Sequence, residues 1–255
     1  MNTRQKILNR IRRKVLILDG ATGTELQALG MPHGMSPELY SITNRDATLS
    51  VHRGYLDAGS DIIYTCTFGA NRYKLAQYGI TDVHDVNRRL AGFAREAAGR
   101  KGLVAGDMGP TGRFVEPFGD LGFEDAVACY KEQALALLEG GVDLFVIETM
   151  IDIQETRAAL IAVKEVADVF TIVTMTFDRT GRTLNGTDPV SALTTLQSLG
   201  ADVVGCNCSA GPAEMVPLIA LMKPHARGPL AAKPHARTEE RCVGKEGRSA
   251  GVPVP

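Results

Sequence analysis

The feature that most constrains the fold is a repeated alternation of short apolar runs with longer amphipathic stretches. The longer stretches carry apolar residues at the 3.6-residue spacing of helices. The apolar runs are typical of buried strands, and they cover residues 15–18, 61–64, 103–106, 142–147, 169–176, 201–208 and 228–232. Strands and helices that alternate every 25 to 40 residues or so indicate parallel βαβ units, and hence an α/β fold.

Such an alternation fits either a doubly wound sheet or a (β/α)₈ barrel. The turns that follow the predicted strands are polar throughout, and a barrel carries its functional loops at the carboxyl ends of its strands. The sequence therefore favours a TIM-type (β/α)₈ barrel. Residues 234–255 contain no apolar run of strand length, so about seven βα units are present and the eighth strand is missing. We expect an incomplete barrel over residues 1–233 and an irregular or disordered tail over residues 234–255.

Composition and charge exclude several classes of function. The 255 residues carry a formal net charge of −1, which gives no electrostatic reason to expect nucleic acid or an anionic membrane as a partner. The basic start is followed by an apolar run of only Val15 to Leu18, which is too short for a signal peptide or a membrane span. Five irregularly spaced cysteines do not form a disulfide framework. We therefore expect a cytoplasmic protein.

Two thiols, Cys206 and Cys208, end the sixth predicted strand. Residues two apart in a strand share a face, so both thiols are expected to point the same way. Pro212 follows in a position suited to the first turn of a helix, and α/β folds keep their chemistry at such strand-to-helix junctions. Buried thiols in apolar strands are nevertheless common as packing, and one pair leaves a tetrahedral zinc short of ligands. The spacing alone leaves both interpretations open.

The first predicted strand runs into a small, glycine-rich turn, Asp19-Gly20-Ala21-Thr22-Gly23-Thr24-Glu25. Its backbone N–H groups are available to a ligand. The turn lacks the P-loop lysine and the spacing of a dinucleotide fingerprint, which argues against a phosphate cradle. Either it holds a small polar ligand together with Asp19, or it is purely structural.

Five blocks at predicted strand ends can be compared with known families as a set. They are residues 18–25 (LDGATGTE), 65–71 (TCTFGAN), 106–112 (GDMGPTG), 145–149 (FVIET) and 205–212 (GCNCSAGP). In this order they resemble the homocysteine S-methyltransferase family, in particular the homocysteine-binding domain of cobalamin-dependent methionine synthase. The resemblance runs from about residue 14 to Pro234, and its end there suggests a frameshifted or truncated product. It implies a (β/α)₈ barrel that transfers a methyl group to the sulfur of homocysteine and so forms methionine.

The resemblance also implies a metal. Cys208 matches the first of three thiolates that hold a catalytic zinc, and a metal-bound homocysteine sulfur stays a nucleophilic thiolate at neutral pH. The other two family ligands belong to a Gly-Gly-Cys-Cys motif that this sequence lacks, and the later Cys242 stands alone. Cys206 and Cys66 are the available substitutes. The alternative is therefore a catalytically inactive, truncated substrate-binding barrel without a complete zinc site.

The remaining site residues are expected to bind the amino-acid part of homocysteine. Asp19 and Glu148 follow predicted strands, where a carboxylate pair could accept charge-assisted hydrogen bonds from the ammonium group, although either could also cap a helix or lie on the surface. Asp107 would support them from behind. The resemblance implies further substrate contacts from Gly20, Ala21, Thr22, Thr65 and Asn207.

The methyl donor has no motif of its own. Loop similarity favours methylcobalamin carried by a separate cobalamin-binding domain or corrinoid protein, with betaine and S-methylmethionine as alternatives. A different barrel enzyme, such as an aldolase, would need a lysine at a strand end, and Lys233 follows the seventh predicted strand.

Overall fold

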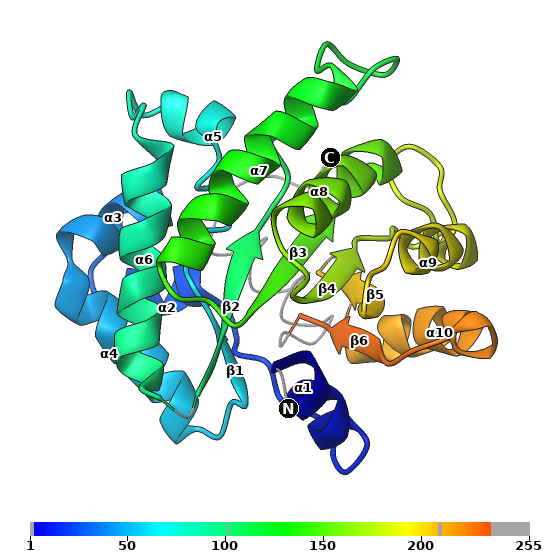
Figure 1. The fold of residues 1–255 in the computed structure, drawn as a ribbon, viewed down its shortest axis with the longest axis horizontal. Helices are drawn as coiled ribbons and strands as arrows, with labels where there is room; N and C mark the ends of the chain where they lie inside the picture. Colours follow the sequence, from blue (N-terminus) through cyan, green and yellow to red (C-terminus); the bar gives the residue numbers. More distant parts are fainter. Residues whose placement is uncertain (1–2, 101, 209–210, 236–255) are drawn as a thin grey trace, which may run out of the picture.

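The computed structural model describes residues 3–100, 102–208 and 211–235. At its centre lies a parallel sheet in the sequential order β1-β2-β3-β4-β5-β6, which curls into a half-barrel (Figure 1). The strands are β1 (Ile62–Tyr64), β2 (Leu103–Met108), β3 (Leu144–Met150), β4 (Phe170–Met175), β5 (Val203–Asn207) and β6 (Leu230–Lys233). This architecture confirms the predicted α/β class with parallel strands.

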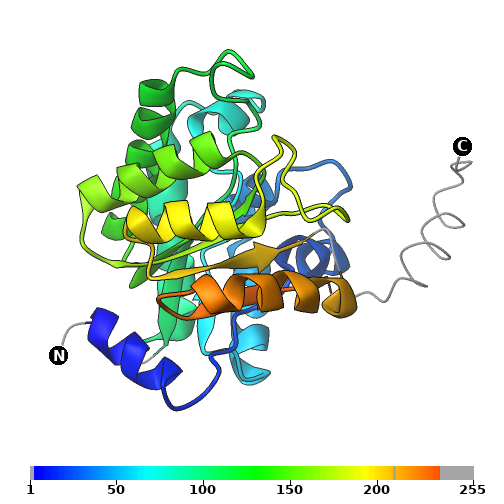
Figure 2. The same cartoon turned by 90° about the vertical axis from the view of Figure 1, so that its right-hand side faces the viewer.

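Helices cover the outer face of the sheet. Figure 1 shows α6 (Val83–Ala98), α7 (Phe123–Glu139) and α8 (Ile153–Val166) side by side over the middle strands. In Figure 2, α9 (Pro189–Ser198) and α10 (Pro212–Met222) lie on either side of β5. The other helices are α1 (Thr3–Ile11), α2 (Thr22–Ala28), α3 (Pro37–Thr43), α4 (Arg45–Asp57), α5 (Arg72–Ala76) and the 3₁₀ turn η1 (Lys223–His225). None of the helices in the described ranges is long and apolar enough to cross a lipid bilayer.

Alternate residues of each strand face two different cores. Val204 and Cys206 of β5 pack outward against the helices, whereas Val203 packs inward with residues from the other strands. The inward cluster consists of Ile62, Tyr64, Ala105, Leu144, Val146, Phe170, Ile172 and Val203. Ile7 of α1 joins it and is fully buried, so α1 covers the amino-terminal end of the curl. At the carboxyl ends of the strands, the inward-facing side chains therefore lie at the open rim of the curl.

The first predicted strand is much shorter than expected. Residues Val15 to Leu18 contribute a single parallel bridge, Leu18 to Ile62, and the Asp19 amide donates to the Ile62 carbonyl at 3.0 Å. Val15 and Ile17 are 82% and 53% exposed, because this segment has a sheet neighbour on one side only. Six strands, rather than the seven predicted, thus make up the sheet in the described residues.

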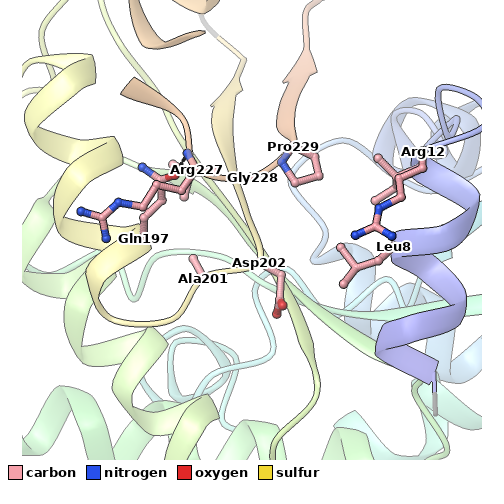
Figure 3. Close-up of a pocket in the computed structure, with 10 residues that line it drawn as sticks. Leu8, Arg12, Gln197, Ala201, Asp202, Arg227, Gly228 and Pro229 are labelled. Carbon is pink, nitrogen blue, oxygen red and sulfur yellow. Dashed lines mark hydrogen bonds between the residues drawn. The ribbon is translucent and has the colours of Figure 1, made fainter. Parts of the chain in front are cut away.

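Among the described residues, the curl stays open between this first segment and β6. A cleft of about 470 Å³ separates residues 14–19 from residues 229–234, and its walls are largely apolar. A second cavity, of about 430 Å³, lies at the amino-terminal end, where Leu8 of α1 and Arg12, just after this helix, face Asp202, Gly228 and Pro229 (Figure 3). The predicted tail falls outside the described residues from 236 onward.

Candidate functional site

A third cavity, of about 650 Å³, opens at the carboxyl ends of the strands. Its walls come from the turn that leads into α2, from the start of α3, from the end of β1 and the loop after it, and from the carboxyl ends of β2, β3, β5 and β6. Lys74 of α5 and Tyr78 complete them. The residues that matter for its chemistry are Asp19, Tyr64, Cys66, Asp107, Glu148, Asn207, Cys208 and Lys233. The cavity therefore lies at the end of the barrel where the sequence predicted it.

Asp19 is buried in the cavity wall and is only 4% exposed. Its Oδ2 accepts a hydrogen bond from the Tyr64 amide at 2.7 Å, whereas its Oδ1 accepts none from the described residues. Burial raises the pKa of Asp19 to about 7, against the opposing effects of nearby Lys233 and the Tyr64 amide. The carboxyl is thus poised to ionise when a cation approaches.

Glu148 lies close to Asp19 through a shared cation, Lys233. The Lys233 Nζ is 3.4 Å from Glu148 Oε2 and 4.0 Å from Asp19 Oδ1. It also lies 3.9 Å from the centre of the Tyr64 ring, within cation–π range. Burial opposes the charge on Lys233, but Glu148, Asp19 and Asp107 outweigh it and raise the lysine's pKa. The two acids predicted to bind an ammonium group therefore already surround one.

Asp107, at the end of β2, adds a third carboxylate. It is 5% exposed, and its Oδ1 accepts no hydrogen bond from the described residues. Burial, followed by the neighbouring Glu148, raises the pKa of Asp107 well above its usual range. The predicted supporting position behind Asp19 and Glu148 is in fact part of the cavity wall.

The structure places Thr65 away from the cavity. Its side chain is fully buried. Thr65 directly follows Tyr64, the last residue of β1, so the two side chains point to opposite faces of the sheet. Its Oγ1 accepts from the Asp107 amide at 3.0 Å and lies 2.5 Å from Thr67 Oγ1. Thr65 therefore holds the β2 end in place rather than lining the cavity.

The prediction that Cys206 and Cys208 share a face is wrong. Cys206 is 1% exposed and packs in the apolar cluster under the helices. Cys208 lies just beyond the end of β5 and adopts a φ of 58°, which breaks the strand alternation and turns its thiol into the cavity. Its Sγ is 3.6 Å from Thr149 Oγ1 and receives a hydrogen bond from Asn207 Nδ2 at 3.4 Å.

Left-handed backbone at residues other than glycine is concentrated at this cavity. In the described chain, Cys66, Thr149 and Cys208 have φ values of 55°, 61° and 58°, and all three line it. Asn207 supports two of them. Its Oδ1 accepts from the Thr149 amide at 3.0 Å, and its Nδ2 donates to Thr149 Oγ1 at 2.8 Å and to Cys208 Sγ at 3.4 Å. Such strain persists where surrounding contacts enforce it, typically at binding sites.

The turn that contains Gly20, Ala21 and Thr22 forms another wall of the cavity. It leads into α2, whose first turn has no side-chain cap at Ala21, so its amides are available to a ligand. A Cβ on Gly20 would lie 2.7 Å from the Tyr55 hydroxyl, and Tyr55 in turn donates to the Ala21 carbonyl at 3.2 Å. Gly20 therefore lets the turn pack closely against α4.

The described residues do not fit a zinc site with three thiolates. They contain no group of three or more His, Cys, Asp or Glu side chains arranged to hold a metal ion. Cys66 lines the cavity, but its Sγ lies 3.3 Å from Ser41 Oγ and burial raises its pKa. Cys206 faces away, and Cys242 lies outside the described residues. Cys208 thus supplies one thiol to the cavity without partners for a tetrahedral metal.

Lys233 and Glu38 are among the wall residues that the sequence analysis does not place in this site. Lys233 enters the sequence analysis only as a possible aldolase lysine. It lies two residues after the inward-facing Ala231 in the same strand, so its side chain points to the same side. Glu38 comes from α3, a helix that was not predicted, and its Oε1 accepts from the Gly69 amide at 2.5 Å. The signal was Ser36-Pro37, an N-cap residue followed by the proline of a first helical turn.

The sequence of the chain matches known proteins along most of its length. Two curated relatives are the methionine synthases of Mycobacterium tuberculosis (strain ATCC 25618 / H37Rv), 33% identical over 250 residues, and Mycobacterium leprae (strain TN), 32% identical over 248 residues. Both alignments cover 90% of this chain but only 21% and 20% of the respective relatives. The chain therefore spans about a fifth of their length.

The fold also matches solved structures. The metallated form of the homocysteine methyltransferase MmuM from Escherichia coli superposes with a TM-score of 0.79, covering 96% of this chain and 91% of that one at 21% identity. Its apo form gives a TM-score of 0.71 at 22% identity. At these identities the likeness supports the fold alone. A family model for homocysteine S-methyltransferases matches residues 16–250, and the chain therefore belongs to the homocysteine S-methyltransferase family.

Proposed function

We propose that this cavity binds L-homocysteine for transfer of a methyl group to its sulfur, which forms methionine. The observation that carries the proposal is the placement of Asp19 and Glu148 around one ammonium group in a cavity that Cys208 also lines. A carboxylate pair binds the ammonium of an amino acid, and the thiol lies on the same cavity wall. The family membership supports this choice of substrate.

Each end of the substrate has a proposed partner. The ammonium group binds to Asp19 and Glu148, and the carboxylate accepts hydrogen bonds from the amides of Gly20, Ala21 and Thr22. Asn207 orients Thr149 and Cys208, the groups proposed to face the sulfur end. Thr65 acts indirectly, by holding the end of β2 beside the site. Burial of these groups excludes water and strengthens each charged contact.

Zinc remains a proposal that rests on Cys208 alone. When bound, zinc would keep the homocysteine sulfur as a thiolate. Because the described residues supply too few donors, a complete zinc site would need ligands from elsewhere.

We further propose that the methyl donor is methylcobalamin held on another domain or protein, and that the reaction takes place in the cytoplasm. The chain matches about a fifth of each methionine synthase, so most of each of those relatives lies outside the matched region. We propose that a donor-binding domain of this kind acts together with the present chain. The open mouth of the cavity, at the carboxyl rim, is the side from which a donor could approach.

A second candidate is a chain that binds homocysteine without transferring a methyl group to it. The shortage of metal donors among the described residues favours this candidate. It shares the amino-acid site with the first proposal and differs from it at the sulfur end only.

Three measurements on the purified chain separate these functions. Calorimetry measures L-homocysteine binding, elemental analysis measures zinc with and without homocysteine, and mass spectrometry detects methionine after addition of methylcobalamin. One zinc per chain with methionine formation supports the transferase, whereas binding without either supports the second candidate. Absence of homocysteine binding overturns both. Asp19→Asn is the control variant, because it removes the ammonium ligand and should weaken binding about tenfold or more.

A further inference from the structure

The cavity wall holds three carboxylates around one lysine. Asp19, Asp107 and Glu148 all raise the pKa of Lys233, which marks them as its electrostatic neighbours. Asp19 Oδ1 and Asp107 Oδ1 are on residues more than nine-tenths buried, and neither accepts a hydrogen bond from the described residues. Buried carboxylate oxygens without donors are costly. These two oxygens can therefore accept hydrogen bonds from a bound ammonium group.

The hold on Lys233 is loose. Its Nζ lies 3.4 Å from Glu148 Oε2 and 4.0 Å from Asp19 Oδ1, both longer than a tight charge-assisted hydrogen bond. Its backbone, by contrast, is fixed at the end of β6, where its carbonyl accepts from the Cys208 amide at 3.2 Å. The side chain is 24% exposed and reaches along the cavity wall. The lysine head can thus move within the cavity while its anchor stays in place.

An α-amino acid carries its ammonium and its carboxylate on the same carbon. If its ammonium takes the place beside Asp19 and Glu148, its carboxylate comes to lie next to the displaced Lys233 head. A simple amine would displace the same head without giving it a new anion. Loss of the contacts between Lys233 and the two acids is therefore offset only when the ligand brings a carboxylate that pairs with the displaced lysine.

We propose, resting on the function proposed above, that Lys233 makes the site selective for α-amino acids over amines. Its ammonium occupies the acidic cluster in the free chain and pairs with the carboxylate of the bound amino acid. Lys233 is a binding residue in this scheme, not a nucleophile. The surrounding acids keep it charged, which disfavours the Schiff-base chemistry of an aldolase.

The test compares L-homocysteine with its decarboxylated analogue, 3-aminopropane-1-thiol. Calorimetry gives the dissociation constant of each for the wild-type chain and for Lys233→Met, an uncharged side chain of similar length. The wild-type chain should prefer homocysteine. In Lys233→Met this preference should fall about tenfold, because the amine gains affinity and the amino acid loses a charged partner. Lys233→Arg, which keeps the charge, should retain most of the preference.

Two further measurements make the result decisive. Thermal unfolding followed by circular dichroism shows whether each variant is folded, and Lys223→Met removes an exposed lysine outside the cavity as a charge control. An unchanged preference in folded Lys233→Met, with homocysteine still bound, overturns this inference and leaves the proposed function intact. Failure of the wild-type chain to bind homocysteine overturns both.

Discussion

Cys206 and Cys208 are two residues apart in the chain, yet their thiols lie on opposite sides of the sheet. Cys206 packs outward under the helices, and Cys208 lines the cavity at the carboxyl rim. The left-handed φ of 58° at Cys208 produces this difference. A structural role for one thiol and a functional role for the other are therefore compatible with their short separation.

The first prediction concerns the reactivity of these thiols. Iodoacetamide should modify Cys208 at least about tenfold faster than Cys206, because Cys206 is 1% exposed and Cys208 opens into the cavity. Peptide mapping by mass spectrometry of a Cys242→Ser chain gives the rate at each site. L-Methionine, which has no thiol, should slow the reaction at Cys208. Equal rates at Cys206 and Cys208 would contradict the assigned orientations.

Much of the fold could be predicted because the strands are apolar and their turns are polar. The last six of the seven predicted strands match β1 to β6 in order. Residues 15–18 are apolar too, but a strand needs neighbours, and this segment has one on a single side. α2 was interpreted as part of a turn, since its seven residues, Thr22–Ala28, give no apolar period that a sequence can display. Local pattern alone does not reveal such tertiary effects.

The site could be predicted where the side chains of a strand alternate regularly between its two faces. Glu148 and Lys233 lie at inward positions of β3 and β6, which brings their side chains to one cavity. Thr65 is one position out of phase and points to the other face. The thiol of Cys208 escapes the same rule, because its left-handed backbone is enforced by contacts with Thr149 and Asn207 that are distant in sequence.

The pKa of Asp19 gives a prediction for stability. Burial raises this pKa from 3.8 to about 7, so the folded chain holds the proton more tightly than the unfolded chain. The resulting stabilisation is complete below about pH 4 and is lost as pH rises through about 7. Asp19→Asn lacks this loss. Urea denaturation should therefore show the variant gaining about 2–4 kcal/mol relative to wild type between pH 4 and pH 8. A constant difference across this range would contradict the raised pKa.

The same titration should control ligand binding. An ammonium group binds the ionised form of Asp19, so the affinity for an amino acid should rise as pH passes through about 7. L-Methionine is the suitable probe, because it has no thiol that titrates in this range. Calorimetry should show about a tenfold gain in affinity from pH 6 to pH 8 in the wild-type chain. Asp19→Asn should bind weakly at both values, and a rise of equal size in this variant would assign the titration to another group.

Asn207 is predicted to hold the strained rim of the cavity. It is fully buried, and its side chain bonds to the amide and hydroxyl of Thr149 and to the thiol of Cys208. Asn207→Ala leaves the Thr149 amide without that acceptor, which should cost about 1–3 kcal/mol in chemical denaturation and weaken homocysteine binding. Gln27→Ala, at an exposed position of α2, should change stability by less than about 0.5 kcal/mol. If both variants behave alike, Asn207 has no special role.

Gly205 provides the sharpest test of the pairing that carries Lys233 to the cavity. Gly205 lies opposite Ala231 in the β5–β6 ladder, and a Cβ at Gly205 would come within 1.9 Å of the Ala231 carbonyl oxygen. Backbone cannot yield as a flexible side chain does, so Gly205→Ala should force β6 away and cost at least about 3 kcal/mol in urea denaturation. It should also weaken homocysteine binding, because Lys233 moves with β6. The matched control is Gly54→Ala within α4, where a Cβ meets nothing within 4 Å. That change should stabilise the chain by about 0.5–1 kcal/mol through helix propensity, whereas a tolerated Gly205→Ala would mean that β6 does not pair with β5 in this register.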